Sequence, residues 1–184
     1  MALFQNKYRI ESIRLKDWDY SSPWWYYVTI NTKGHAEYFG KIVKGKMDLN
    51  ELGSIAEEEW LKTKSLRSNI DLDYYVIMPN HIHGIIILNN EKRRDVARYV
   101  STQNIIFSKI SPKENSLSAI IRSFKSAVSK RMHELGFYHF SWQSRFYERI
   151  IRNEKELMNI RKYIEQNPMK WDIEKDDYEN LIID

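Results

Sequence analysis

The amino-acid sequence predicts an α+β fold that is broadly ferredoxin-like, with one antiparallel sheet and helices packed on it. Two observations carry this prediction. Hydrophobic patterns follow one another in the order strands, helix, strands, helix, strand, helix. The run from Ile85 to Leu88 is apolar at every position, which is typical of a central strand covered on both faces. Because the 184 residues contain no internal repeat and no linker, we expect a single domain over residues 1–184.

The first part of the chain predicts a strand, a hairpin turn and a helix. Residues 1–22 are polar and basic without a clear period, and we expect an N-terminal lead-in there. The stretch WWYYVTINT, which begins at Trp24, is rich in aromatic and β-branched residues and predicts a strand. Lys44-Gly45-Lys46 predicts a tight turn. Asn50 is suited to cap a helix that runs to about Lys64.

The middle of the chain predicts two further strands and a second helix. DLDYYVIM and HIHGIIIL have strand composition and are joined around Pro79-Asn80. Residues 89–115 are polar and longer than a normal connection, and are expected to form an insertion loop. Ser116 is suited to cap a helix whose apolar residues recur at helical spacing, and Gly136 is suited to close it.

The last part predicts one strand and one helix. RFYERIIRN has strand composition. The final helix is predicted from about Glu154 to Gln166, with Pro168 ending it, because the residue before a proline resists helical geometry.

Composition limits the class of partner. The net charge of +4 and the pI of about 9.1 fit a polyanionic partner, and the 14% aromatic content suits stacking on single-stranded nucleic acid. The lack of cysteine excludes disulfides and thiolate metal sites. No apolar run approaches the length of a membrane span, so we expect a cytoplasmic protein without a membrane partner.

Two of the five histidines, His81 and His83, lie one residue apart in a predicted strand. Alternate residues of a strand point to the same face, so both imidazoles are expected on one side of the sheet. The pair fits a metal site or a pair of acid–base groups, but two ligands do not make a metal site. Polar filler near a strand end remains the alternative.

On the predicted final helix, Tyr163 and Asn167 are four residues apart and share one face. A tyrosine hydroxyl and a carboxamide oxygen on one face could serve as nucleophile and metal ligand. The structural alternative is that Tyr163 packs against the sheet and that Asn167 caps the helix. Spacing alone favours the structural alternative.

Several stretches together resemble the HUH transposases with a single catalytic tyrosine, a group of insertion-sequence transposases, and in particular their REP-associated tyrosine transposase branch. MPNHIHG and, about eighty residues later, YIEQNP resemble the two signature blocks of that family. SLSAIIRSFKSAVSKRM resembles the helix before the site, and WQSRFYERIIRNEKEL resembles the segment that leads into the tyrosine helix. The resemblance covers nearly the whole chain and implies the ferredoxin-like, RRM-like palm of the HUH endonuclease fold.

The resemblance also implies roles for individual residues. His81 and His83 match the HUH pair, Tyr163 matches the catalytic tyrosine, and Asn167 matches the third metal ligand, with Gln166 beside it. The implied activity is cutting and rejoining of single-stranded or hairpin DNA through a 5′-phosphotyrosine link. The family expectation for the metal is Mg²⁺ or Mn²⁺, whereas ligand type alone favours Mn²⁺ or Zn²⁺.

Basic side chains provide candidate phosphate contacts. We expect the protein to be a monomer or a homodimer. The candidates are Arg9, Arg14, Arg122, Lys125 and Arg131. Two other functions stay open at this point. One is a non-catalytic nucleic-acid-binding module on the same fold, and the other is a metal-dependent nuclease that uses water, with Tyr163 structural.

Overall fold

Four strands form the central sheet of the computed structural model, which describes residues 3–4, 7–8, 15, 17–89 and 115–174. They lie in the order β6-β7-β3-β8, and every neighbouring pair is antiparallel. Their bounds are β3 Trp25–Asn31, β6 Ile70–Ile77, β7 His81–Leu88 and β8 Tyr147–Ile150. The two strands that come first and third along the chain occupy the centre of the sheet. This order confirms the ferredoxin-like prediction.

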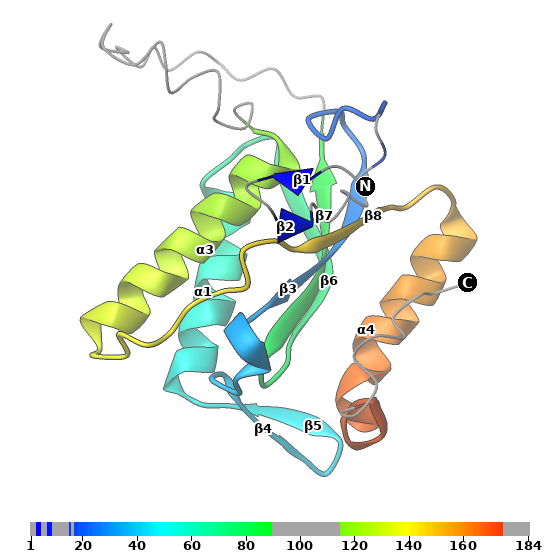
Figure 1. Ribbon diagram of the computed structural model, residues 1–184. Helices are drawn as coiled ribbons and strands as arrows, with labels where there is room; N and C mark the ends of the chain where they lie inside the picture. Colours follow the sequence, from blue (N-terminus) through cyan, green and yellow to red (C-terminus); the bar gives the residue numbers. More distant parts are fainter. Residues whose placement is uncertain (1–2, 5–6, 9–14, 16, 90–114, 175–184) are drawn as a thin grey trace, which may run out of the picture.

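Helices cover both faces of the sheet. α1 (Glu51–Ser65) and α3 (Leu117–Glu134) lie on one face, and α4 (Glu154–Glu174) runs across the other (Figure 1). The side chain of Asn50 accepts from Gly53 N at the start of α1. The side chain of Ser116 accepts from Ala119 N at the start of α3. Both predicted N-caps are therefore confirmed.

Small elements complete the described chain. β4 (Gly40–Val43) and β5 (Lys46–Leu49) form a hairpin outside the main sheet. Its turn has positive φ at Lys44 (51°) and Gly45 (70°), a conformation that two-residue hairpin turns require and that glycine adopts without strain. The predicted turn is confirmed. The remaining elements are β1 Leu3–Phe4, β2 Lys7–Tyr8 and the 3₁₀ helix Lys33–His35.

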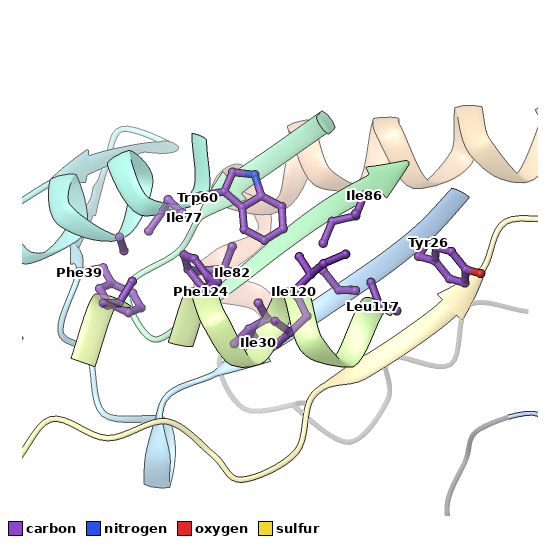
Figure 2. Packing of buried hydrophobic residues seen from close by; sticks show 14 of the residues in the cluster. Tyr26, Ile30, Phe39, Trp60, Ile77, Ile82, Ile86, Leu117, Ile120 and Phe124 are labelled. Atoms are coloured by element: carbon purple, nitrogen blue, oxygen red, sulfur yellow. The ribbon is translucent and has the colours of Figure 1, made fainter. Parts of the chain in front are cut away.

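The larger hydrophobic core lies between the sheet and the two helices α1 and α3 (Figure 2). Trp60 of α1 is 1% exposed and lies directly over Gly84 of β7. The smaller core lies between the sheet and α4, with Tyr27, Ile85, Ile160 and Ile164 among its buried members. β7 is therefore covered on both faces, as its apolar run predicted.

The predicted end of the last helix is wrong. α4 does not stop at Gln166 but continues through Pro168 to Glu174. Proline removes one backbone N–H donor, which weakens a helix at that point. Trp171, one turn later in α4, is only 6% exposed and packs against His81 of the sheet, and this burial offsets the lost hydrogen bond. Asn167 is therefore a residue of the helix interior and does not cap a helix end.

Two sequence predictions fall mainly outside the described residues. These are the insertion loop at 89–115, of which 90–114 is not described, and much of the lead-in at 1–22. Among the described helices, none has the length and apolar character to cross a membrane.

Replacement of Gly84 by alanine tests the contact between β7 and α1. An added Cβ would overlap Trp60 Cζ2 and lie 2.8 Å from Trp60 Cη2. Because Trp60 is enclosed, we expect Gly84→Ala to lower the free energy of unfolding by about 1–3 kcal/mol in denaturant titrations. Trp60→Phe should cost less in the Gly84→Ala background than in the wild type. Strictly additive losses would contradict the packing described here.

Candidate active site

His81 and His83 lie on the face of β7 that α4 covers. Ile82, between them, points into the larger core, so the strand period sends both histidines to the opposite side. The His83 ring packs edge-on against Tyr163 of α4, with ring centroids 5.3 Å apart. His81 is 6% exposed and His83 is 0% exposed. The predicted shared face is confirmed, and the pair is buried under a helix.

Asn80 orients the His81 ring. The Asn80 side-chain nitrogen donates to the His35 carbonyl at 3.1 Å, which turns its Oδ1 toward His81. This oxygen lies 2.6 Å from His81 Nδ1. An amide oxygen can only accept, so His81 Nδ1 carries the hydrogen and donates to it. His81 Nε2 therefore presents a lone pair.

Two hydroxyl groups of β3 hold the His83 ring. His83 Nδ1 lies 2.8 Å from the Tyr27 hydroxyl and 3.0 Å from Thr29 Oγ1. Thr29 is the direct cross-strand partner of His83 in the sheet, and the Tyr27 ring stacks on the His83 ring at a centroid distance of 5.7 Å. Hydroxyls both donate and accept, so this cradle fits either tautomer of His83.

The two imidazoles meet at their Nε2 atoms. His81 Nε2 and His83 Nε2 are 2.9 Å apart. Since His81 Nε2 is an acceptor, one arrangement satisfies every group: His83 Nε2 donates to His81 Nε2, and His83 Nδ1 accepts from the Tyr27 hydroxyl. Transfer of the His83 proton to Nδ1 would leave two lone pairs directed at a common point.

Burial keeps both histidines neutral. Desolvation, followed by the charge of His35, lowers the pKa of His81 to about 3. Desolvation, followed by the charge of His81, holds the pKa of His83 well below its ordinary range. Neutral imidazole is the form that binds metal ions. The pair is therefore in the metal-binding protonation state at neutral pH.

One face of α4 closes the site. Tyr163, Asn167 and Trp171 follow one another at intervals of four residues and so lie on one stripe of the helix. Tyr163 contacts His83, and the Trp171 ring lies 5.8 Å from the His81 ring. Asn167, between them on the stripe, is 3% exposed. The structure therefore brings all four predicted catalytic and metal-binding residues to one layer of the protein.

Tyr27 holds the His83 ring from β3, whereas Tyr163 contacts that ring from α4. The Tyr163 hydroxyl oxygen is buried under the helix. Tyr138 is 75% exposed and contacts His133 instead. Tyr147 of β8 packs against Tyr27 at 6.2 Å between ring centroids.

The predicted DNA-contacting residues lie elsewhere. Arg122, Lys125 and Arg131 belong to α3, on the opposite side of the sheet from the histidines. Arg131 pairs with Glu58 at 2.7 Å and Glu59 at 2.9 Å.

Lys125 donates to the carbonyls of Gln143 and Arg145, and desolvation by burial lowers its pKa to about 8. Arg122 is exposed on the surface of α3. Arg9 and Arg14 lie outside the described residues. A role for these five side chains in DNA binding stays a prediction.

Sequence reasoning missed the residues that orient the histidines. Asn80 stood out only as part of a strand connection, and Tyr27 and Thr29 only as members of a strand. The available signal was positional: Asn80 directly precedes the histidine pair, and Tyr27 and Thr29 alternate on their strand as the histidines do. The register between β3 and β7 was needed to connect them.

Two ion pairs hold α4 over the site. Arg149 of β8 binds Glu156 at 2.6 Å, and Arg161 of α4 binds Asp73 of β6 at 2.8 Å. Both carboxylates are 15% exposed, so these pairs are shielded more than ordinary surface pairs. The helix is thus tied to both edge strands of the sheet.

The buried histidines predict acid sensitivity of the metal-free protein. The native pair binds fewer protons than the unfolded chain once the pH falls below about 6.5, the ordinary histidine value. Stability is therefore complete above that pH and declines as the pH falls toward about 3. We expect the free energy of unfolding, measured by denaturant titration in EDTA, to fall by about 1.4 kcal/mol per pH unit for each histidine.

The matched variants separate this effect from general acid sensitivity. His81→Gln should reduce the slope of the free energy of unfolding against pH between pH 6.5 and 5. Replacement of the exposed His139 by Gln is the control and should leave this slope unchanged. An equal slope in wild type and His81→Gln would contradict the neutral buried pair.

Comparison with known proteins places the chain in a family. A Haemophilus influenzae (strain Rd) protein named only "Uncharacterized protein" is 32% identical over 163 residues, covering 88% of this chain and 89% of that protein. A second protein of the same strain, named "Putative REP-associated tyrosine transposase", is 35% identical over 96 residues. That match covers 51% of this chain and 47% of the relative. No protein-family profile matches the chain.

A solved structure shares the fold. The REP-associated tyrosine transposase determined in complex with a REP hairpin superposes with a TM-score of 0.55 and 20% sequence identity. The match covers 88% of this chain and 74% of that one. This structure shows that the fold is shared, and the sequence relatives show that this chain belongs to the REP-associated tyrosine transposase family.

Proposed function

We propose that this protein is a metal-dependent transposase that cuts and rejoins single-stranded DNA through a covalent link to Tyr163. The observation that carries the proposal is the convergence of four side chains in one layer. The Nε2 atoms of His81 and His83 face each other, and Tyr163 and Asn167 lie on the stripe of α4 directly above them. A purely structural helix contact would need neither a buried histidine pair nor a buried carboxamide.

The donor set fits a divalent cation. Both Nδ1 atoms are held by side-chain oxygens, which is the usual way in which proteins orient metal-binding histidines. Among the described residues, no group of three His, Asp or Glu side chains could hold a metal ion. The amide oxygen of Asn167 is suited to Mg²⁺ or Mn²⁺ and supplies the third ligand in our proposal.

The bound cation would polarise the scissile phosphate and stabilise negative charge on the leaving oxygen. The side chains of the protein perform the remaining steps. Tyr163 Oη attacks the phosphorus and gives up its proton, and a new O–P bond forms. The bond from phosphorus to the 3′ oxygen breaks, and that oxygen takes up one proton, so that no proton is gained or lost overall. The products are a 5′-phosphotyrosine and a free 3′-hydroxyl. Attack of a 3′-hydroxyl on that link rejoins the strands, so no external energy source is required.

The site is closed in the conformation described here. His83 has no exposed surface, and Tyr163 and Trp171 of α4 pack against the rings of the pair. In the proposed reaction α4 moves away from the sheet far enough to admit a phosphate. The ion pairs Arg149–Glu156 and Arg161–Asp73 oppose that motion. DNA binding supplies the free energy for opening.

The proposed substrate is single-stranded or hairpin DNA. The structural relative was solved with a REP hairpin, and the positive net charge and aromatic content of this chain suit a polyanion with exposed bases.

Replacement of Tyr163 by phenylalanine tests the nucleophile. The change removes one oxygen, so we expect folding and DNA affinity to stay near wild-type values. Cleavage of end-labelled hairpin DNA and the covalent protein–DNA band on a denaturing gel should both disappear. Tyr147→Phe is the matched control and should keep the band. Cleavage without any covalent species in the wild type would favour the nuclease that uses water.

Replacement of the ligands tests the metal. We expect EDTA, His83→Ala and Asn167→Ala each to abolish cleavage, and both variants to weaken Mn²⁺ binding at least 10-fold in calorimetric titrations. Gln166→Ala is the matched control, because it removes the neighbouring carboxamide from a half-buried position. Full activity in EDTA, or unchanged Mn²⁺ affinity in a folded His83→Ala protein, would refute metal dependence.

A further inference from the structure

Two adjoining cavities lie where α4 begins, away from the histidine pair. The first has a volume of about 490 Å³ and lies between the start of β3, the end of β7 and the first turn of α4. The second has a volume of about 300 Å³ and lies between β8 and the first two turns of α4. Arg152 and Asn153 line both cavities. The two cavities therefore adjoin each other at these two residues.

Tryptophan side chains form the apolar wall of the first cavity. Trp24 is 40% exposed, but its Nε1 donates to the Ile151 carbonyl at 2.7 Å, which fixes the plane of the indole. Trp18 packs against it edge-on at a centroid distance of 5.7 Å. Trp25 lines the same cavity. An exposed indole that is already immobilised offers a stacking surface at little entropic cost.

Polar groups line the rest of the first cavity. Asn89, Asn153 and Glu154 border it together with Arg152. Carboxamides can pair with the donor and acceptor edge of a nucleobase, and a carboxylate can accept from an exocyclic amino group. A carboxylate disfavours a bare phosphate in this space. Aromatic wall and mixed polar rim together fit a base better than an anion.

The second cavity has the opposite character. Its lining includes Arg149, Arg152 and Lys155 against a single carboxylate, Glu156. Glu156 is already engaged by Arg149 and by the backbone N–H of Arg152. Within the described part of the chain, the side chains of Arg152 and Lys155 form no ion pair, and both are exposed. The excess cationic charge fits a phosphate group.

The two cavities lie on the same side of the sheet as the proposed active site. Trp25 and Thr29 are four residues apart on β3, so they point to the same face about 13 Å from each other along the strand. Thr29 is the cross-strand partner of His83. A single strand running along α4 could therefore pass from the histidine pair to the cavities within a few nucleotides.

We propose that these cavities form a binding site for one unpaired nucleotide of single-stranded DNA, with the base against Trp24 and Trp25 and the phosphate beside Arg152 and Lys155. This inference deepens the proposed function and rests on it, since it concerns the strand that the transposase would process. Paired bases could not enter the first cavity, so the site would favour single strands over duplex.

Binding of two fluorescein-labelled probes tests the base contact. One probe is a dT15 strand, and the other is an abasic strand with the same fifteen phosphates. We expect wild-type protein to bind dT15 at least 10-fold more tightly than the abasic strand. Trp24→Ala should reduce this preference several-fold, whereas Trp24→Phe should retain most of it. Tyr138→Ala, which removes a more exposed ring at the far end of α3, should leave it unchanged.

Arg152→Gln tests the phosphate contact and does not disturb the core. We expect this variant to bind both probes more weakly by the same factor, about 3- to 10-fold. The slope of log affinity against log salt concentration should become shallower by about 0.7. Lys41→Gln is the matched control, because this exposed cation belongs to the hairpin at the opposite end of the molecule (Figure 1). An unchanged slope for Arg152→Gln would overturn this half of the assignment.

The outcomes separate this inference from the proposed function. If wild-type protein forms the Tyr163 adduct but folded Trp24→Ala keeps the full preference for dT15, the proposed nucleotide site is wrong and the proposed transposase function is supported. If the base preference depends on Trp24 but no cleavage or adduct forms, the nucleotide site stands and the strand transfer is wrong.

Discussion

The burial of β7 on both faces is the constraint on which the rest of this structure depends. One face must accept Trp60, and Gly84 permits this because it has no side chain. The other face carries His81 and His83, which cannot be buried without hydrogen-bond partners. Asn80, Tyr27 and Thr29 supply those partners. The core and the site thus lie on the two opposite faces of one strand, and successive residues of β7 alternate between them.

Helix α4 has two roles that oppose each other. Its apolar residues complete the smaller core, and its ion pairs with β6 and β8 hold it against the sheet. The same helix carries Tyr163 and Asn167, whose proposed roles require access for a phosphate. A closed site keeps the histidines neutral and excludes water, but it must open before it can act. In our proposal the two ion pairs that hold α4 against the sheet therefore set the free-energy cost of opening the site.

Local signals in the sequence predicted most of the fold. Asn50 and Ser116 act as N-caps, and Lys44-Gly45 forms the hairpin turn, because each depends on a few neighbouring residues. The predicted end of α4 was wrong because a distant contact outweighs a local signal. The local signal of Pro168 favours termination, but burial of Trp171 against His81 outweighs it. A contact between residues ninety positions apart leaves no local pattern.

The sequence by itself determined the element order, the shared face of His81 and His83, and the shared stripe of Tyr163 and Asn167. Each follows from the period of a strand or a helix. Only the tertiary structure decided that these two faces meet, that Tyr27 and Thr29 cradle His83, and that α4 seals the pair from solvent. Strand register and helix docking decide such relations, because they bring together residues from separate elements and the periodicity within one element carries no information about its neighbours.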